Sequence, residues 1–178
     1  MPTYATHSDV QGIIAKSLRS LTAADKSLAN KTLFLSHSSR DAGLLPGALS
    51  MLEGHGASVY VDVLDQELPK DPCPATAERL KSAVVACPRF VLFLTSNTAD
   101  SVWIPWELGL ADSARGHDGV ALLPVCASTS DTAWTRREYL DLYQRVVWGP
   151  LQGETGNVWF VWDHHKNTGT ALSKWCRP

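Results

Sequence analysis

The sequence predicts an α/β domain in which helices cover both faces of a parallel sheet. Short apolar runs that favour β-strands alternate regularly with segments of helical periodicity. The run FVLFL at residues 90–94 is apolar throughout, as expected of a strand buried on both faces. With 178 residues, 44% of them hydrophobic and 19% charged, the chain has the size and composition of one folded domain. We therefore expect a doubly wound sheet.

The first expected element is an amphipathic helix over residues 10–21, where apolar side chains recur at helical spacing. A polar connector at residues 24–31 leads into the first strand, residues 32–35. Asp41 is positioned to cap a second helix over residues 42–53, which two glycines end.

The middle of the chain predicts a strand over residues 57–63, a helix over residues 75–86 and a strand over residues 89–94. The loop between the first two, residues 64–74, contains three prolines and several charges. Loops of this length in α/β domains are more often functional than incidental.

The rest of the chain continues the alternation. The expected elements are a helix over residues 103–113, a strand over 120–125, a helix over 132–142, a strand over 143–147 and a short helix ending near Trp175. The apolar run at residues 158–162 fits an edge strand or a partner surface, and we favour packing on the domain.

Composition argues against several classes of partner. The net charge of −2 and the lack of a basic run interleaved with aromatic residues predict no binding of nucleic acid or of an anionic membrane. No apolar stretch approaches the roughly 18 residues that span a bilayer, and the first residues do not resemble a secretory leader. We therefore expect a cytoplasmic protein.

The cysteines and histidines predict no metal site. The four cysteines are scattered, with no C-x-x-C pair, and are expected to be reduced thiols. The pair His164 and His165 has no acidic or cysteine partner at ligand spacing, so both are expected to be exposed loop residues. No metal and no cofactor is predicted.

Polar residues follow the predicted strands, at the edge where parallel sheets bind ligands. These rim residues are Ser36, His37, Ser38 and Ser39 after the first strand, Asp62 at the second, Thr95, Ser96 and Asn97 after the third, and residues 103–107 at the start of the next helix. The sequence contains no G-x-G-x-x-G, P-loop, G-x-S-x-G or H-E-x-x-H motif. The rim must therefore work by chemistry other than that of these enzyme classes.

The segment SVWIPWE, residues 101–107, is the most specific candidate site in the sequence. Trp103 and Glu107 are four residues apart on the expected helix, so they share a face. An indole receives a pyridinium ring, and a carboxylate stabilises positive charge on a ribose. Breaking a nicotinamide–ribose bond needs no proton donor because nicotinamide leaves as a neutral molecule, so one carboxylate suffices.

Three segments resemble, in order and spacing, the sequence boxes of the TIR (Toll/interleukin-1 receptor) domain family. They are LFLSHSSRD at residues 33–41, VYVDVLDQELP at residues 59–69 and SVWIPWELGLAD at residues 101–112. The sequence is most similar to the bacterial NAD-cleaving branch that acts in antiphage defence, the Thoeris-like proteins. The resemblance covers residues 33–147 and leaves the N-terminal helix and the tail outside.

The resemblance implies a flavodoxin-like TIR fold, with a five-stranded parallel sheet and helices on both faces. The expected organisation is an N-terminal helix and connector (1–31), the TIR domain (32–150) and a C-terminal extension packed on it (151–178). Glu107 then corresponds to the catalytic carboxylate that contacts the nicotinamide-ribose hydroxyls. The other implied substrate-binding residues are Trp103, Trp106, His37, Ser38 and Asp62.

The implied activity is that of an NAD⁺ glycohydrolase or ADP-ribosyl cyclase, with NAD⁺ as substrate. Such proteins make a nucleotide signal in bacterial antiphage immunity, associate with themselves through TIR contacts and act beside a separate effector protein. The sequence does not determine the product, which could be linear, cyclic or conjugated ADP-ribose.

Two alternatives remain open. One is a non-enzymatic scaffold that binds other TIR domains, against which Glu107 argues because pure adaptors generally lack this carboxylate. The other is an enzyme similar to nucleoside deoxyribosyltransferases, which would not react with NAD⁺. Release of nicotinamide from NAD⁺ distinguishes both from the leading hypothesis.

Overall fold

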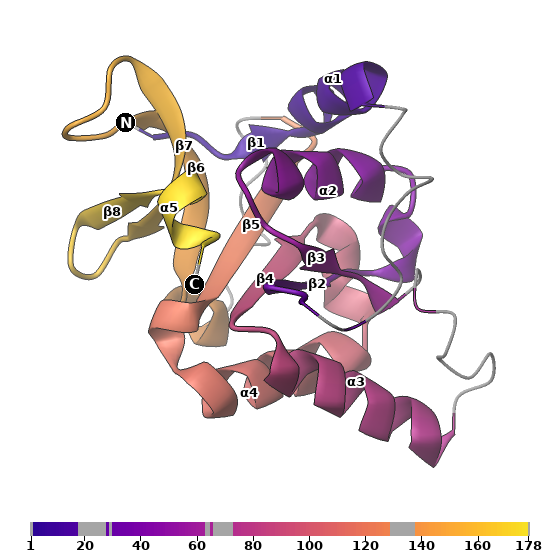
Figure 1. The fold of residues 1–178 in the computed structure, drawn as a ribbon. Helices are drawn as coiled ribbons and strands as arrows, with labels where there is room; N and C mark the ends of the chain where they lie inside the picture. The colour runs from indigo at the N-terminus through magenta and orange to yellow at the C-terminus, as the bar shows by residue number, and fades with distance from the viewer. Residues whose placement is uncertain are drawn as a thin grey trace.

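The computed structural model describes residues 2–17, 28, 30–62, 65, 73–128 and 138–177. Within these ranges the strands form one sheet in the order β3-β2-β4-β5-β6-β7-β8, with β1 beside β5 (Figure 1). The strands are β1 (Ala5–Thr6), β2 (Leu33–Ser36), β3 (Val59–Tyr60), β4 (Arg89–Leu94), β5 (Val120–Cys126), β6 (Gln144–Pro150), β7 (Asn157–Asp163) and β8 (Thr168–Ala171). The helices are α1 (His7–Ser17), α2 (Leu45–Gly54), α3 (Pro74–Ala86), α4 (Trp103–Arg115) and α5 (Leu172–Trp175).

The neighbouring strands β3, β2, β4, β5 and β6 all run parallel, which confirms the expected doubly wound α/β class. The C-terminal tail adds to this sheet, since β7 pairs antiparallel with β6 and β8 pairs antiparallel with β7. The apolar run at residues 158–162 is therefore an inner strand and not an edge strand. Phe160 and Val161 point to opposite faces of the sheet and are both buried, which explains why the run is apolar on both faces.

Alternating side chains of the central strands fill two separate cores. Leu33 and Leu35 of β2 face the core beneath α1 and α2, whereas Phe34 faces the core beneath α3 and α4. Figure 1 shows these helix pairs on opposite sides of the sheet. Because side chains alternate along a strand, Ser36 lies on the same face as Phe34, toward α4.

The inner face of α4 carries one acid. Its buried residues are Ile104, Glu107, Leu108 and Ala111, a stripe at helical spacing. Pro105 lies in the first turn, where backbone N–H groups have no partner within the helix, so it breaks no hydrogen bond. The stripe that fixes α4 on the sheet therefore also carries Glu107 into the interior.

The N-terminal segment takes part in the sheet. Residues 5–6 pair with the end of β5, and the helix α1 begins directly after them at His7, earlier than expected. The Asp9 carboxylate accepts hydrogen bonds from the Thr6 backbone and hydroxyl at this helix start. Thr3 forms a bridge with Trp148 of β6. Positions 18–21 of the expected helix lie outside the described residues.

Other expectations differ in detail. The second strand is shorter than residues 57–63, and most of the loop at residues 64–74 lies outside the described residues. Positions 132–137 of the helix expected over 132–142 also lie outside them. The rest of that helix is a 3₁₀ turn, η6 (Glu138–Leu142). Asp41 caps no helix: it lies in a 3₁₀ turn, η1 (Ser39–Asp41), whose own cap is Ser38.

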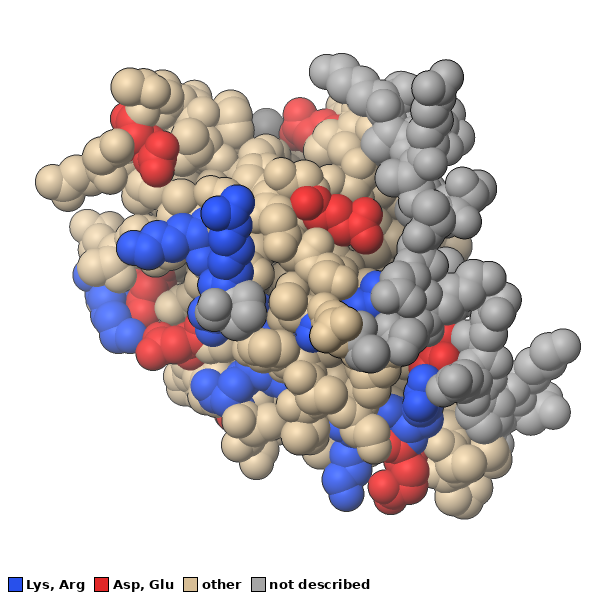
Figure 2. Space-filling view, viewed as in Figure 1, with Lys and Arg blue, Asp and Glu red and all other residues tan. Residues whose placement is uncertain are grey.

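The surface carries charges of both signs. On the face shown in Figure 2, acidic and basic side chains are interspersed among a majority of other residues. Cys73, Cys87, Cys126 and Cys176 are free thiols. Among the described residues, no helix is long and apolar enough to cross a membrane.

Candidate active site

Glu107 and Ser36 meet inside the fold. The Ser36 hydroxyl, at the end of β2, donates a hydrogen bond to Oε2 of Glu107 on α4 at 2.5 Å. Both residues are buried, with Glu107 5% exposed. The contact follows from the sequence pattern, because Ser36 occupies the α4-facing register of β2 and Glu107 occupies the inner stripe of α4.

Burial shifts the ionisation of Glu107. The pKa of this carboxyl is raised to about 7: removal from water raises it most, the Ser36 hydrogen bond lowers it, and the nearby charge of Asp62 raises it. The side chain is therefore divided between its acid and carboxylate forms near neutral pH. A carboxyl with this property is suited to stabilising a transient cation and to accepting a proton.

His37 and Asp62 lie beside this pair. Nδ1 of His37 is 3.5 Å from Oδ1 of Asp62, and the His37 side chain is 6% exposed. At this distance the two atoms form no hydrogen bond, and within the described residues His37 Nδ1 is a buried nitrogen without a partner. An unsatisfied buried nitrogen at a strand end is suited to a ligand.

The other residues singled out from the sequence lie around the same rim. Ser38 is buried, and its hydroxyl accepts a hydrogen bond from the Arg40 backbone, so it shapes the turn after β2. Trp103 and Trp106 are 36% and 37% exposed and contact each other edge to face, with ring centroids 5.6 Å apart. They lie at the surface and not in the core, whereas Glu107 points inward.

The rim is held together by a buried aspartate. Asp41 accepts hydrogen bonds from the Thr95 hydroxyl and the Asn97 amide, each at 2.7 Å. These contacts join the turn after β2 to the turn after β4. Thr95 and Asn97, which the sequence placed at the rim, therefore have a structural partner there.

A second buried aspartate fixes the chain after β3. Asp65 accepts a hydrogen bond from the Tyr60 hydroxyl at 2.7 Å and pairs with Arg79 of α3 at 2.9 Å. Burial and the hydrogen bond to Asp65 raise the pKa of Tyr60, which keeps the hydroxyl protonated as a donor. This contact anchors the chain just beyond Asp62.

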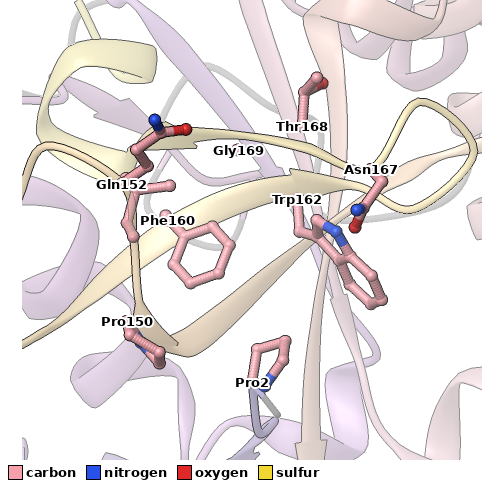
Figure 3. Close-up of a pocket in the computed structure, with 9 residues that line it drawn as sticks. Pro2, Pro150, Gln152, Phe160, Trp162, Asn167, Thr168 and Gly169 are labelled. Atoms are coloured by element: carbon pink, nitrogen blue, oxygen red, sulfur yellow. The ribbon is translucent and has the colours of Figure 1, made fainter.

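A pocket of about 450 Å³ lies elsewhere, on the C-terminal hairpin. Figure 3 shows Phe160 and Trp162 of β7 in this pocket, with Pro2 nearby. Its remaining lining residues are Pro150, Leu151, Gln152, Asn167, Thr168 and Gly169. The pocket shares no residue with the rim at Glu107, so we assign it no part in the chemistry there.

The structure adds Ser36 to the candidate site. The sequence indicates that Ser36 is a rim residue but does not show that it contacts Glu107. The signal was available in two patterns: the alternation along β2 and the single acid in the apolar stripe of α4. What the sequence lacked was the relative placement of strand and helix.

Comparison with known proteins identifies the family of this chain. Residues 33–150 match the family model described as TIR domain. The chain is 36% identical over 134 residues to a protein of Bacillus cereus (strain MSX-D12) named probable 3' cyclic ADP-D-ribose synthase ThsB', covering 74% of this chain and 67% of that protein. The family match over residues 33–150 contains β2, α4 and the Ser36–Glu107 contact. The chain belongs to the TIR domain family.

Proposed function

We propose that this protein cleaves NAD⁺ at the nicotinamide–ribose bond and closes the remaining ADP-ribose into a cyclic nucleotide. The observation that carries the proposal is the buried Glu107, hydrogen-bonded by Ser36 at the sheet edge where α/β proteins bind ligands. The similarity to a probable 3' cyclic ADP-D-ribose synthase supports the same chemistry.

In the first step the bond between C1 of the ribose and the pyridinium nitrogen breaks. Both electrons of the bond go to nicotinamide, which leaves neutral, and the ribose becomes an oxocarbenium-like cation. The Glu107 carboxylate stabilises this positive charge at close range, in a site of low dielectric. Ser36 holds one carboxylate oxygen, which fixes the direction of the other.

In the second step an oxygen nucleophile attacks the cation. Water gives linear ADP-ribose, and a hydroxyl of the same molecule gives a cyclic isomer. Either attack forms one C–O bond and releases one proton. Glu107, whose pKa is raised to about 7, accepts this proton and returns it to solvent near neutral pH.

The surrounding residues are assigned to substrate binding. Trp103 and Trp106 offer exposed aromatic faces for the nicotinamide or adenine ring. The unsatisfied nitrogen of His37 is suited to a ribose hydroxyl or a phosphate oxygen. Ser38 shapes the same turn, and Asp62 contributes negative charge beside Glu107.

The biological role we propose is production of a nucleotide signal in bacterial antiphage immunity. A separate effector protein would respond to the product, and contacts between TIR domains would assemble the enzyme. This role rests on family membership and on the named relative.

The test is incubation of concentrated protein with NAD⁺, followed by chromatography with mass detection. We compare the wild type with Glu107→Gln, which keeps the shape and removes the charge, and with Glu78→Gln on the exposed surface of α3 as the matched control. Release of nicotinamide by the wild type and the control, but not by Glu107→Gln, is the expected result. The mass of the second product identifies it as linear or cyclic.

Two outcomes would count against the proposal. Equal release by Glu107→Gln would remove Glu107 from the chemistry. No release by any variant, even with a crowding agent that promotes assembly, would favour a non-enzymatic scaffold.

A further inference from the structure

The turn between β7 and β8 places two histidines beside an aspartate from another part of the chain. His164 and His165 are consecutive, and their ring centroids are 4.1 Å apart. Asp141, in the 3₁₀ turn η6 before β6, brings its carboxylate to within 3.2 Å of His164 Nε2. The sequence-based expectation that these histidines lack an acidic partner is therefore wrong, because pairing of β6 with β7 closes a separation that sequence spacing does not reveal.

The turn is fixed by its own hydrogen bonds. Oδ1 of Asp163 accepts from the backbone N–H groups of His165 at 3.1 Å and Lys166 at 3.0 Å. A carboxylate that caps the following backbone in this way holds a tight turn. Both imidazoles are therefore held on the side that faces Asp141.

His164 is the unexpected residue of this group. Its side chain is only 18% exposed, so it is not the open loop residue expected from the sequence. Within the described residues, both of its ring nitrogens are buried and have no hydrogen-bond partner. The 3.2 Å contact with Asp141 has the distance of a hydrogen bond but not its geometry. Two unsatisfied nitrogens on one buried ring are costly unless something else binds them.

His165 makes the kind of hydrogen bond that metal-binding histidines make with the ring nitrogen that does not contact the metal. Its Nε2 lies 2.7 Å from the backbone carbonyl of Asp141. Donation to that carbonyl places the ring proton on Nε2 and leaves Nδ1 as the free lone pair. Histidines that bind metals usually donate their other N–H to a carbonyl or carboxylate, which fixes the ring and the tautomer.

We propose that Asp141, His164 and His165 form a binding site for a divalent transition-metal cation of the Zn²⁺ class. One ligand atom from each residue lies within 4.8 Å of the other two. In a tetrahedral zinc site with bonds of about 2.0–2.1 Å, neighbouring ligand atoms are roughly 3.3 Å apart. The His164–Asp141 contact already has this spacing, and the Asp141 carboxylate is on an exposed side chain that can turn toward the ion. Two imidazoles and a carboxylate favour zinc over magnesium or calcium.

Neighbouring charges modulate this site. Arg145 donates to the same Asp141 oxygen at 3.0 Å, which orients the carboxylate and also weakens its attraction for a cation. The ammonium of Lys166 is paired with Asp118 at 3.4 Å and Asp163 at 3.1 Å, so its charge is compensated locally. We therefore expect a site of moderate affinity.

A bound ion would strengthen the link between two segments that already contact each other through His165 and the Asp141 carbonyl. His164 and His165 belong to the β7–β8 hairpin, and Asp141 belongs to the segment leading into β6. A cross-link here would hold the C-terminal hairpin against the edge of the parallel sheet, and ligand binding to the folded state would raise its thermal stability. The proposal is independent of the NAD⁺ chemistry.

The experiment is calorimetric titration of the full chain with Zn²⁺ alone at pH 7.5, after treatment with a chelator. The background carries Cys73→Ser, because Cys73 is an exposed thiol whose pKa is lowered by hydrogen bonds from Thr76 and which would compete for zinc. His164→Gln and Asp141→Asn remove one ligand each. His117→Gln is the matched control, since His117 is an exposed histidine 3.3 Å from one aspartate, Asp112.

The expected result is saturable binding of one Zn²⁺ by the background protein and by His117→Gln, with affinity about tenfold or more lower in the ligand variants. Zinc should raise the melting temperature of the first two proteins and not of the last two. Melting without metal checks that every variant is folded. No saturable binding by the background protein, or equal affinity in His164→Gln, would overturn the proposal.

Discussion

The Ser36 hydroxyl donates to Oε2 of Glu107 at 2.5 Å, joining the end of β2 to the inner face of α4. This contact places an acid inside the apolar stripe of a helix and gives it one strong hydrogen-bond donor. Burial and hydrogen bonding act on Glu107 in opposite directions, and burial is the larger effect.

Ser36→Ala should raise the pKa of Glu107 further, because the hydrogen bond that favours the carboxylate is lost. A hydrogen bond to a charged group contributes about 1.5–3 kcal/mol, so the midpoint of the pH profile should move up by about one pH unit or more. Activity should fall at pH 7 and recover at higher pH. The measurement is kcat/KM for nicotinamide release against pH.

Ser82→Ala is the control for this change, since Ser82 is an exposed residue of α3 whose hydroxyl donates to the Glu78 backbone carbonyl. It should leave the profile unchanged. A uniform loss of activity at every pH in Ser36→Ala would show that Ser36 acts on something other than the ionisation of Glu107.

Asp62→Asn should move the same midpoint in the opposite direction. The negative charge of Asp62 raises the pKa of Glu107, although it is a smaller cause than burial. Removing it should lower the midpoint by a fraction of a pH unit. Infrared titration of the Glu107 carboxyl in the substrate-free protein measures this without interference from NAD⁺ binding. Asp100→Asn, whose side chain pairs with Arg40 at the exposed rim, should cause no shift.

Glu107→Gln should stabilise the fold at alkaline pH. The folded-state pKa of about 7 lies above the ordinary glutamate pKa of 4.5, so the folded state binds more protons than the unfolded state between these values. The stabilisation that comes from the raised pKa of Glu107 is therefore fully present below pH 4.5. It is lost as pH rises through 7, which lowers the free energy of unfolding of the wild type by up to about 3 kcal/mol. The amide carries no charge and avoids this loss.

Urea unfolding of both proteins at pH 5.5 and pH 8.5 measures this effect. The advantage of Glu107→Gln should be larger at pH 8.5. An advantage that is the same at both pH values would mean that Glu107 ionises normally in the folded protein.

Trp103→Ala and Trp106→Ala should raise KM for NAD⁺ with a smaller effect on kcat, if their exposed faces bind a ring of the substrate. Aromatic contacts of this kind contribute about 0.5–1.5 kcal/mol, which corresponds to roughly a threefold to tenfold change. Trp148→Ala is the matched control, because Trp148 is 38% exposed and lies on β6. Unchanged KM in both variants, measured by steady-state nicotinamide release, would assign the two indoles to another surface function.

Local sequence patterns determined most of the fold. The all-apolar run of β4 and the periodic stripes of α3 and α4 were predicted within a few residues because burial on two faces, or on one helical face, leaves a direct pattern in the sequence. The tail strand β7 was the main exception. An apolar run of that length is equally compatible with an edge strand, an inner strand or a partner surface, and only its pairing with β6 and β8 decides among them.

In the candidate site, too, the sequence determined some features and only the tertiary structure decided others. The sequence by itself determined which polar groups end the strands and that Glu107 shares a helix with Trp103 and Trp106. The tertiary structure alone decided that Ser36 bonds to Glu107, that Asp41 is a buried acceptor and not a helix cap, and that Asp141 meets His164. Each of these contacts joins residues far apart in the chain, and their separation in space depends on sheet order and helix placement, which side-chain periodicity does not encode.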